Sequence, residues 1–226
     1  MVKEGYYFGL PLLVLGGVAY LLQWTIAAVV LVCLALFVFS FFRDPERVIP
    51  QEAGAVVSPA DGRVVVVTEE AHAGRPGKRV SIFLAVWNVH VNRAPATGFI
   101  SDLEYKPGKF LAAMREQASL ENEQNIFSLS TDAGDMVFKQ IAGLIARRVV
   151  SWKKSGDRVA RGERIGLVRF GSRADVWLPR EAEILVKVGD NVKGGSSVLA
   201  RWQTQRPAAS GAAESDARLS PVGKRS

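Results

Sequence analysis

Cysteine and histidine are nearly absent from this chain of 226 residues, which contains one cysteine, Cys33, and two histidines, His72 and His90. A single cysteine excludes a disulfide within the chain and any metal site built from several thiolates. With two imidazoles and one thiol, the sequence also lacks the clusters of ligands that bind transition metals. We therefore expect no metal.

Charge is missing from one long stretch, because no charged residue lies between Gly5 and Phe42. Polar residues near Gln23 divide the stretch into two apolar arms, 5–22 and 25–42, of 18 residues each. As a helix, each arm would be roughly 27 Å long, close to the hydrocarbon thickness of a bilayer. The sequence therefore predicts a membrane anchor, residues 1–47, in which a transmembrane helical hairpin turns near Gln23.

The flanking charges predict the orientation of this anchor. Lys3 precedes the first arm, and Arg43 and Arg47 follow the second, so the positive-inside rule places both ends and the following domain on the cytoplasmic side of the inner membrane. A cleavable signal peptide is disfavoured by the length of the apolar stretch. One span plus an interfacial segment stays open, because Pro11 suits an irregular first arm.

The net charge of +7 has two explanations. For a domain attached to a membrane, scattered basic residues indicate attraction to anionic lipid headgroups. Nucleic-acid binding is the general alternative, but no recognition helix or aromatic–basic repeat accompanies the charge. We therefore expect a membrane and no nucleic acid as partner.

Residues 48–202 form a predicted β domain. Short runs rich in valine, isoleucine and aromatic residues alternate with glycine, proline and aspartate turns, which favours strands. One minor helix is expected at 110–123, and the polar segment 203–226 is expected to be a disordered tail. The predicted strands are 64–68, 80–86, 99–105, 126–131, 136–145, 147–152, 164–170, 174–178 and 183–187.

An internal repeat refines the fold class. The pattern G-D-x-V-x-x-G begins at Gly156 and again at Gly189, 33 residues later. These turns are similar to those of biotinyl and lipoyl carrier domains, which implies a β-sandwich with hairpin corners. The hairpin tip that carries the cofactor in those domains is missing, so their carrier function does not transfer.

Three further motifs contain groups that could perform chemistry. They are the S-P-A-D-G turn with Asp61, the N-V-H-V-N-R segment with His90, and the F-G-S turn with Gly171 and Ser172. Each alone is more often structural: an ordinary turn, a core histidine and another turn. Together, a carboxylate, an imidazole and a hydroxyl are the groups needed to activate a nucleophile. His72 is the rival base, but it lies in a polar loop.

In this order, these motifs resemble the phosphatidylserine decarboxylases in their short bacterial and archaeal form. The apolar block ending in F-F-R-D-P-E-R precedes S-P-A-D-G, N-V-H-V-N-R, a G-D-x-V-x-x-G turn and F-G-S, so the resemblance extends to about Trp202. The chain departs from longer members at Arg173, where they have Gly-Ser-Thr, and by its single histidine in the second motif. These departures leave the proton donor of the later reaction open.

The resemblance implies a proenzyme that cuts itself between Gly171 and Ser172 into fragments 1–171 and 172–226. His90, oriented by Asp61, would deprotonate Ser172, which would become a pyruvoyl group without an external cofactor. That group would react with the amine of phosphatidylserine and accept electrons as carbon dioxide leaves, giving phosphatidylethanolamine. The family likeness does not indicate which residues bind the carboxylate or phosphate of the substrate; Arg173 and the basic residues near the membrane junction are our candidates, and His90 is the candidate proton donor.

Two other functions remain open at this point. A non-catalytic, membrane-tethered β-sandwich adaptor would share the hairpin and the glycine turns, but it would not require Asp61, His90 and Ser172 to converge. A soluble pyruvoyl-dependent amino-acid decarboxylase is disfavoured, because it would have no use for two long apolar arms. Exposed strand edges and confinement to a membrane also favour a homodimer.

Overall fold

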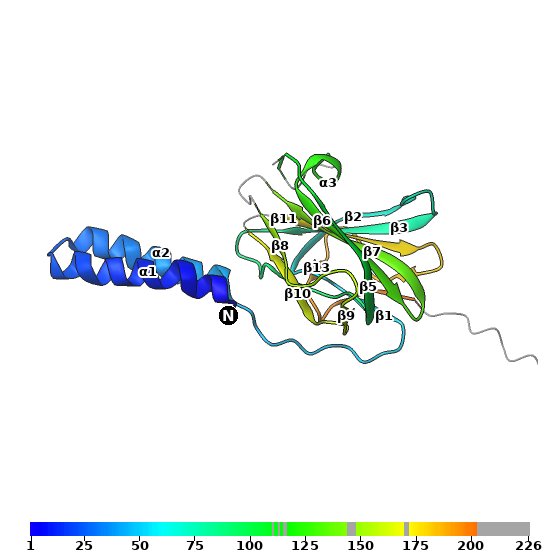
Figure 1. The fold of residues 1–226 in the computed structure, drawn as a ribbon, viewed down its shortest axis with the longest axis horizontal. Coiled ribbons are helices and arrows are strands. Elements are labelled where there is room, and N and C mark those ends of the chain that lie inside the picture. Colours follow the sequence, from blue (N-terminus) through cyan, green and yellow to red (C-terminus); the bar gives the residue numbers. More distant parts are fainter. Residues whose placement is uncertain (110, 113, 115–116, 144–147, 170–171, 203–226) are drawn as a thin grey trace, which may run out of the picture.

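The computed structural model describes residues 1–226 apart from 110, 113, 115–116, 144–147, 170–171 and 203–226 (Figure 1). Two antiparallel helices, α1 (Lys3–Leu21) and α2 (Thr25–Phe41), form a hairpin that projects from a β domain. The hairpin turns at Gln23, whose φ of 63° is in the left-handed region. The predicted hairpin and the position of its turn are confirmed, whereas the predicted tail lies outside the described residues.

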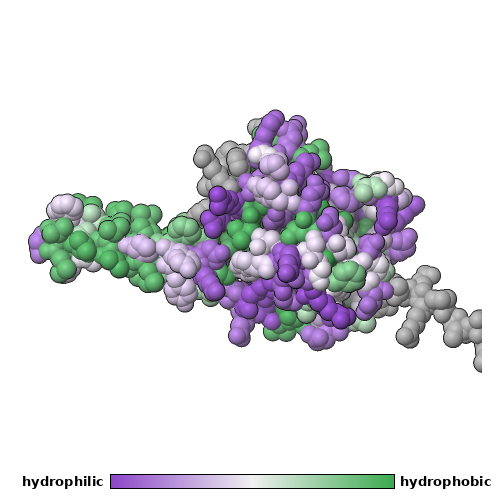
Figure 2. Space-filling view, viewed as in Figure 1, coloured by the Kyte–Doolittle hydropathy of each residue, from purple (hydrophilic) through white to green (hydrophobic). Residues whose placement is uncertain are grey.

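Small residues form the contact between the two helices. Gly9 approaches Phe39 so closely that an added Cβ would lie 2.4 Å from its ring. Small side chains allow helix backbones to approach, so the large apolar side chains face outward. Ile26, for example, is 83% exposed. Figure 2 shows the resulting apolar surface of the hairpin beside the largely hydrophilic surface of the β domain.

The two helices differ in their bounds from the 18-residue transmembrane arms that the sequence predicted. Helix α2 has 17 residues, roughly 26 Å of helix, and α1 starts with the charged residues Lys3 and Glu4. Among the residues described, no helix has both the length and the apolar character needed to cross a membrane. The prediction of transmembrane spans is therefore corrected to a pair of apolar helices.

The remainder of the described chain is predominantly β, as predicted, but its strands form three antiparallel sheets instead of the two of a sandwich. The sheets have the orders β13-β2-β3-β11-β7-β6-β5-β9, β1-β14-β12 and β4-β10-β8. The strands are β1 (Ala55–Val57), β2 (Gly62–Glu69), β3 (Gly77–Leu84), β4 (Val91–Arg93), β5 (Gly98–Lys106), β6 (Gln124–Thr131), β7 (Gly134–Ala142), β8 (Val149–Ser151), β9 (Arg158–Val159), β10 (Arg164–Val168), β11 (Ser172–Pro179), β12 (Glu183–Ile184), β13 (Asn191–Val192) and β14 (Val198–Arg201).

The internal repeat supplies both edges of the largest sheet. Its first copy contains β9 and its second contains β13, and these two strands end the strand order on opposite sides. In both copies the leading glycine has a positive φ, 89° at Gly156 and 102° at Gly189. The aspartate that follows accepts a hydrogen bond from a backbone N–H three residues earlier, at 2.9 Å in each case. The two similar sequences therefore fold into similar turns.

The two faces of the largest sheet differ in character. One face contributes Ile82, Phe138 and Val176 to the main hydrophobic core. The other face bears Asp175, whose carboxylate accepts a hydrogen bond from Ser119 of the short helix α3 (Ala118–Glu121) at 2.6 Å. In the described part of the predicted helix 110–123, only this four-residue turn is helical.

Candidate active site

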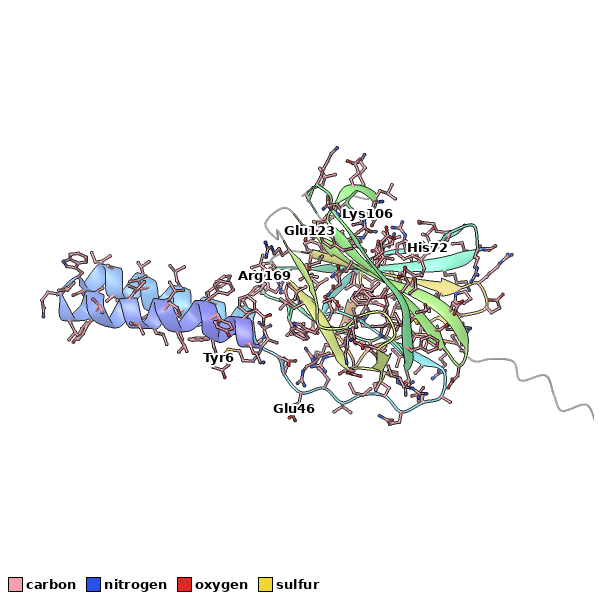
Figure 3. The ribbon with its side chains drawn as sticks, in the orientation of Figure 1. Tyr6, Glu46, His72, Lys106, Glu123 and Arg169 are labelled. Carbon is pink, nitrogen blue, oxygen red and sulfur yellow. The ribbon has the colours of Figure 1, made fainter. Side chains whose placement is uncertain are left out.

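Ser172 is the first residue of β11 and lies inside the largest sheet. It pairs with Leu84 of β3 on one side and with Ala142 of β7 on the other. The residue is completely buried, and its Oγ has no hydrogen-bond partner among the residues that the structure describes. Its predicted partner in cleavage, Gly171, lies outside the described residues. Figure 3 labels the nearby Arg169, which lies where the domain faces the hairpin.

The base of the hairpin covers His90, the predicted base. The rings of Phe41 and His90 have centroids 4.2 Å apart, and His90 is only 1% exposed. Burial, reinforced by the positive charge of Arg43, lowers the pKa of His90 to about 4, although the Asn88 carbonyl opposes this shift. His90 is therefore neutral at pH 7.

A backbone carbonyl fixes the tautomer of His90. The Nδ1 atom lies 2.9 Å from the Asn88 carbonyl oxygen, which can only accept, so Nδ1 carries the proton. The Asn88 side chain in turn accepts a hydrogen bond from the Ala85 N–H at 2.8 Å, which holds this turn in shape. The Nε2 atom is left with a lone pair and, in the described part of the chain, no hydrogen-bond partner. This is the protonation state that a general base requires.

The fold brings His90 into contact with Val168, which precedes Ser172 by four residues. Strand β3 ends at Leu84, the partner of Ser172, and the chain reaches His90 six residues later. The carbonyl of His90 then accepts a hydrogen bond from the N–H of Val168 at 3.2 Å, four residues before Ser172. The predicted base and nucleophile thus flank the segment that contains Gly171.

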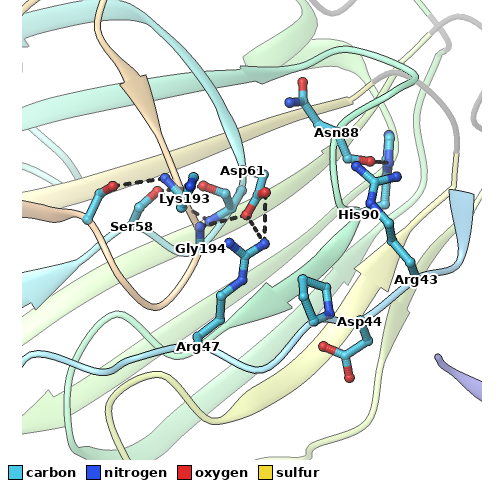
Figure 4. A network of polar contacts seen from close by, with 12 residues as sticks. Arg43, Asp44, Arg47, Ser58, Asp61, Asn88, His90, Lys193 and Gly194 are labelled. Carbon is cyan, nitrogen blue, oxygen red and sulfur yellow. Dashed lines mark hydrogen bonds and ion pairs between the residues drawn. The ribbon is translucent and has the colours of Figure 1, made fainter. Parts of the chain in front are cut away.

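Asp61 does not orient His90 in this structure, contrary to the expectation from the sequence. Both of its carboxylate oxygens lie 2.9 Å from Nη2 of Arg47, and one accepts a hydrogen bond from the Gly194 N–H at 2.8 Å. In Figure 4 the contacts of Asp61 run to these two residues, and the contact of His90 runs to the Asn88 carbonyl. The Asn88 carbonyl occupies the Nδ1 position that the carboxylate was expected to fill.

Asp61 belongs to a set of ion pairs that fixes the segment after the hairpin. Arg47 and Asp61 are both largely buried, and Asp44 pairs with Arg93 at 2.7 Å and also with Arg164. Glu46, by contrast, points away from the domain (Figure 3). From the sequence, Arg47 was expected to set membrane orientation and Asp61 to orient His90, so the role of these ion pairs in attaching the hairpin base beside His90 was missed.

Hydrophobic contacts complete this attachment. Phe41 and Phe42 pack with Val89, Val91 and Leu167, which come from the three-stranded sheet β4-β10-β8 and the turn before it. The Arg43 guanidinium donates hydrogen bonds to the carbonyls of Ser40 and Trp87, each at 2.7 Å. The base of the apolar hairpin therefore packs directly against the candidate site.

Arg173, predicted to contact substrate, is buried and already bonded within the protein. Its exposed fraction is 1%, its Nε donates to Asp175 at 2.6 Å, and its Nη2 donates to Ser81 at 2.8 Å. Because successive side chains of a strand alternate, Arg173 points to the opposite face of the sheet from Ser172. This geometry favours a structural role for Arg173.

His72, the rival base, lies at the other end of β11. Its ring is 5.0 Å from that of Trp177, five residues along the strand from Ser172, or roughly 17 Å. Both aromatic residues line an open groove of about 830 Å³. In Figure 3, His72 lies on the far side of the domain from the hairpin. This position removes His72 as the partner of Ser172.

The described residues contain no group of three or more histidine, cysteine, aspartate or glutamate side chains arranged to bind a metal ion. What the site does contain is a buried hydroxyl, a neutral imidazole with a free lone pair and an adjoining apolar surface. Such a combination is typical of an enzyme that activates a nucleophile, and a binding module has no need of it.

The comparisons with known proteins identify the family. The sequence profile of the phosphatidylserine decarboxylases matches residues 34–200. A phosphatidylserine decarboxylase proenzyme of Symbiobacterium thermophilum is 49% identical over 205 residues, which cover 89% of this chain and 95% of that protein. The corresponding protein of Solibacter usitatus is 50% identical over 202 residues, which cover 89% and 96%. The protein of Geotalea uraniireducens is 46% identical over 206 residues, which cover 88% and 95%.

The chain therefore belongs to the phosphatidylserine decarboxylase family, and it is a carboxy-lyase of phospholipid biosynthesis. The resemblance described from the motifs is confirmed. Family membership removes the non-catalytic adaptor and the soluble amino-acid decarboxylase from consideration. It leaves the roles of individual residues to be argued from the geometry.

Proposed function

We propose that this chain is a proenzyme that cuts itself between Gly171 and Ser172 and then decarboxylates phosphatidylserine at the membrane. The observation that carries the proposal is the pair of groups around segment 169–171: a buried, unpaired Ser172 hydroxyl and a neutral His90 with an unpaired Nε2. The names of the relatives support it, because each is a proenzyme.

The cleavage step uses groups of this chain alone. His90 Nε2 takes the proton from Ser172 Oγ, the oxygen attacks the carbonyl carbon of Gly171, and the C–N bond of that peptide breaks as the amine takes up a proton. A base then removes the Cα proton of residue 172 and the Cβ–Oγ bond breaks, which releases a chain ending at Gly171 as a carboxylate that keeps this oxygen. Residue 172 is left as a dehydroalanine with a free amino group, and water hydrolyses its imine tautomer to a ketone with release of ammonia.

The surroundings of residue 172 fit such a pyruvoyl group. The position is enclosed between Leu84 and Ala142, and its one polar side-chain atom has no hydrogen-bond partner to lose. When present, the group supplies an electrophilic carbonyl that binds the substrate amine and accepts the electrons released with carbon dioxide. His90, after Nε2 has taken up the proton that the substrate amine loses when it reacts, is our candidate for returning a proton to the product carbon.

Asp61 contributes to this site as a positioning residue. Its carboxylate holds Arg47, and Arg47 belongs to the segment that leads from the hairpin into the domain. That segment keeps Phe41 against His90, which maintains the low pKa of the imidazole. We assign to Asp61 this indirect role in place of direct contact with His90.

The apolar hairpin attaches the domain to the cytoplasmic face of the inner membrane. Its small residues face inward and its large apolar residues face outward, with Leu21 78% and Ile26 83% exposed. Burying such a surface in lipid is favourable by roughly 25 cal/mol per Å². Because the hairpin base contacts His90, lipid headgroups would reach the site from this side.

Electrophoresis under denaturing conditions, followed by mass spectrometry, tests the proposal. We expect fragments 1–171 and 172–226, the smaller without a free amine at its start, and carbon dioxide release from phosphatidylserine. The Ser172→Ala variant should remain folded and uncut. An unaltered chain that remains intact with serine at position 172 would reject self-processing, and cleavage of Ser172→Ala would reject the role of this serine.

A further inference from the structure

Arg169 has a guanidinium without an anionic partner in the described part of the chain. The residue is half-buried, and among the described residues its buried Nε has no hydrogen-bond partner and no carboxylate lies within ion-pair distance of it. Its guanidinium carbon lies 5.5 Å from the centre of the Phe8 ring of α1. An unsatisfied donor on a permanently charged group is costly, so this position suits an anion that arrives from outside the chain.

Neighbouring arginines differ from Arg169 in being satisfied within the protein. Arg43 donates to two backbone carbonyls, Arg47 pairs with Asp61, and Arg93 pairs with Asp44. Arg173 is bonded to Asp175 and Ser81 and is 1% exposed. The anion-binding role that the sequence assigned to Arg173 therefore fits Arg169 better.

Arg169 is close to the reacting residue in the sequence, and its side chain reaches the apolar hairpin that we propose enters the lipid. It lies three residues before Ser172, and its backbone N–H donates to the Arg148 carbonyl at 3.3 Å. Its side chain extends to the hairpin, at the boundary between the β domain and the apolar helices (Figure 3). In phosphatidylserine the phosphodiester lies between the reacting amine and the acyl chains. Arg169 likewise lies between residue 172, where the amine would react, and the apolar hairpin, where the acyl chains would lie.

We propose that Arg169 binds the phosphodiester of the phosphatidylserine headgroup while the substrate amine is at residue 172. This inference rests on the proposed function. A guanidinium matches phosphate oxygens with paired hydrogen bonds. An ion pair with the departing carboxylate would instead stabilise the substrate relative to the transition state, because the carboxylate loses its charge as carbon dioxide forms.

The test compares R169Q and R169K with R148Q, a matched control that removes the same charge from an exposed arginine nearby. After self-cleavage has been scored by electrophoresis, each protein is titrated calorimetrically with short-chain phosphatidylethanolamine, which has the phosphodiester and lacks the carboxylate. The KM for short-chain phosphatidylserine is measured in parallel. We expect R169Q to raise the Kd and the KM by the same factor, at least tenfold, R169K to retain most of the affinity, and R148Q to resemble the unaltered protein.

Several results would overturn the proposal. They are an unchanged Kd in R169Q, an equal loss in R148Q, or a rise confined to the KM for phosphatidylserine, which would assign Arg169 to the carboxylate. If R169Q does not cut itself, R169K provides the measurement. If neither is cut although both are folded by circular dichroism, Arg169 acts in cleavage and the proposal is wrong. Failure of the unaltered, cleaved protein to act on phosphatidylserine would reject the proposed function instead.

Discussion

The two ends of strand β11 contain similar residues in different surroundings. At the Ser172 end, the hairpin base covers His90, whose Nε2 is unpaired. At the Trp177 end, His72 contacts the Trp177 ring at a tilted angle but faces an open groove. Burial lowers the pKa of both imidazoles, but only that of His90 falls as far as about 4. Enclosure by a neighbouring element, more than residue type, therefore distinguishes a candidate base from a surface histidine.

The largest expected effect separates the two histidines by mutation. His90→Gln removes the base beside Ser172 and should slow self-cleavage by about 10²–10⁴-fold, the usual contribution of a general base. His72→Gln is the matched control and should leave the rate unchanged. The rate is measured from the appearance of the two fragments after synthesis in vitro. Equal slowing in both variants, or normal cleavage of His90→Gln, would contradict the claim that His90 and not His72 is the base.

The middle of β11 provides the next test. Asp175→Asn leaves the buried Arg173 without its charged partner, and breaking such a pair costs about 3–5 kcal/mol in the free energy of unfolding. The exposed pair of Asp135 and Arg75 offers a control, because its loss should cost less than about 1 kcal/mol. Urea unfolding in the Ser172→Ala background, where the chain is intact, measures both. A small loss for Asp175→Asn would show that Arg173 finds another partner.

Sequence patterns predicted the parts of this fold that depend on local structure. The uncharged stretch predicted two helices with a turn at Gln23, and the repeated Gly-Asp turns recur with the same backbone conformation. The ion pair between Arg173 and Asp175 was missed, although it is also local. The two residues are two apart on a strand, so they share a face, and this spacing could have indicated their ion pair.

The sequence indicated which residues are candidates for the site, but it did not indicate all of the contacts that these residues make. His90 and Ser172 were identified because an imidazole and a hydroxyl carry recognisable chemistry, and in the fold His90 is hydrogen-bonded to Val168, four residues before Ser172. The contact between Asp61 and Arg47 joins the domain to the end of the hairpin, and no local pattern reports such a pairing. The Asn88 carbonyl was missed because a backbone group has no signature in the sequence.

A more moderate effect is expected from the ion pair between Arg47 and Asp61. If Asp61 acts through Arg47, then Asp61→Asn and Arg47→Gln should slow self-cleavage to the same extent, about tenfold for the loss of one charge-assisted contact. The double variant should be no slower than either single variant, because both remove the same link. Much slower cleavage in Asp61→Asn than in Arg47→Gln would instead indicate a direct action of Asp61 on the reacting groups.

The smallest expected effect is a shift in a pH profile, and it tests the enclosure of His90 directly. Protonation of His90 removes the base, so self-cleavage should be constant from pH 8 to about 5 and half lost near pH 4. Because the pKa of His90 is lower in the folded protein than in the unfolded chain, the unfolded chain takes up a proton on His90 at a higher pH than the folded protein does. The stability from burying the neutral ring is therefore complete above pH 6.5 and is lost as the pH falls toward 4.

Phe41→Ala should make the surroundings of His90, at the Ser172 end of β11, as open to solvent as those of His72 at the Trp177 end. Removing the ring that covers His90 admits water, which lowers the desolvation cost of the imidazolium and raises the pKa toward 6.5. The midpoint of the cleavage profile should move upward by about one unit, the scale of shift that burial produces. Ile26→Ala, at the far end of α2, should leave the midpoint at about 4. An unchanged midpoint in Phe41→Ala would mean that the β domain itself, without the hairpin, keeps His90 neutral.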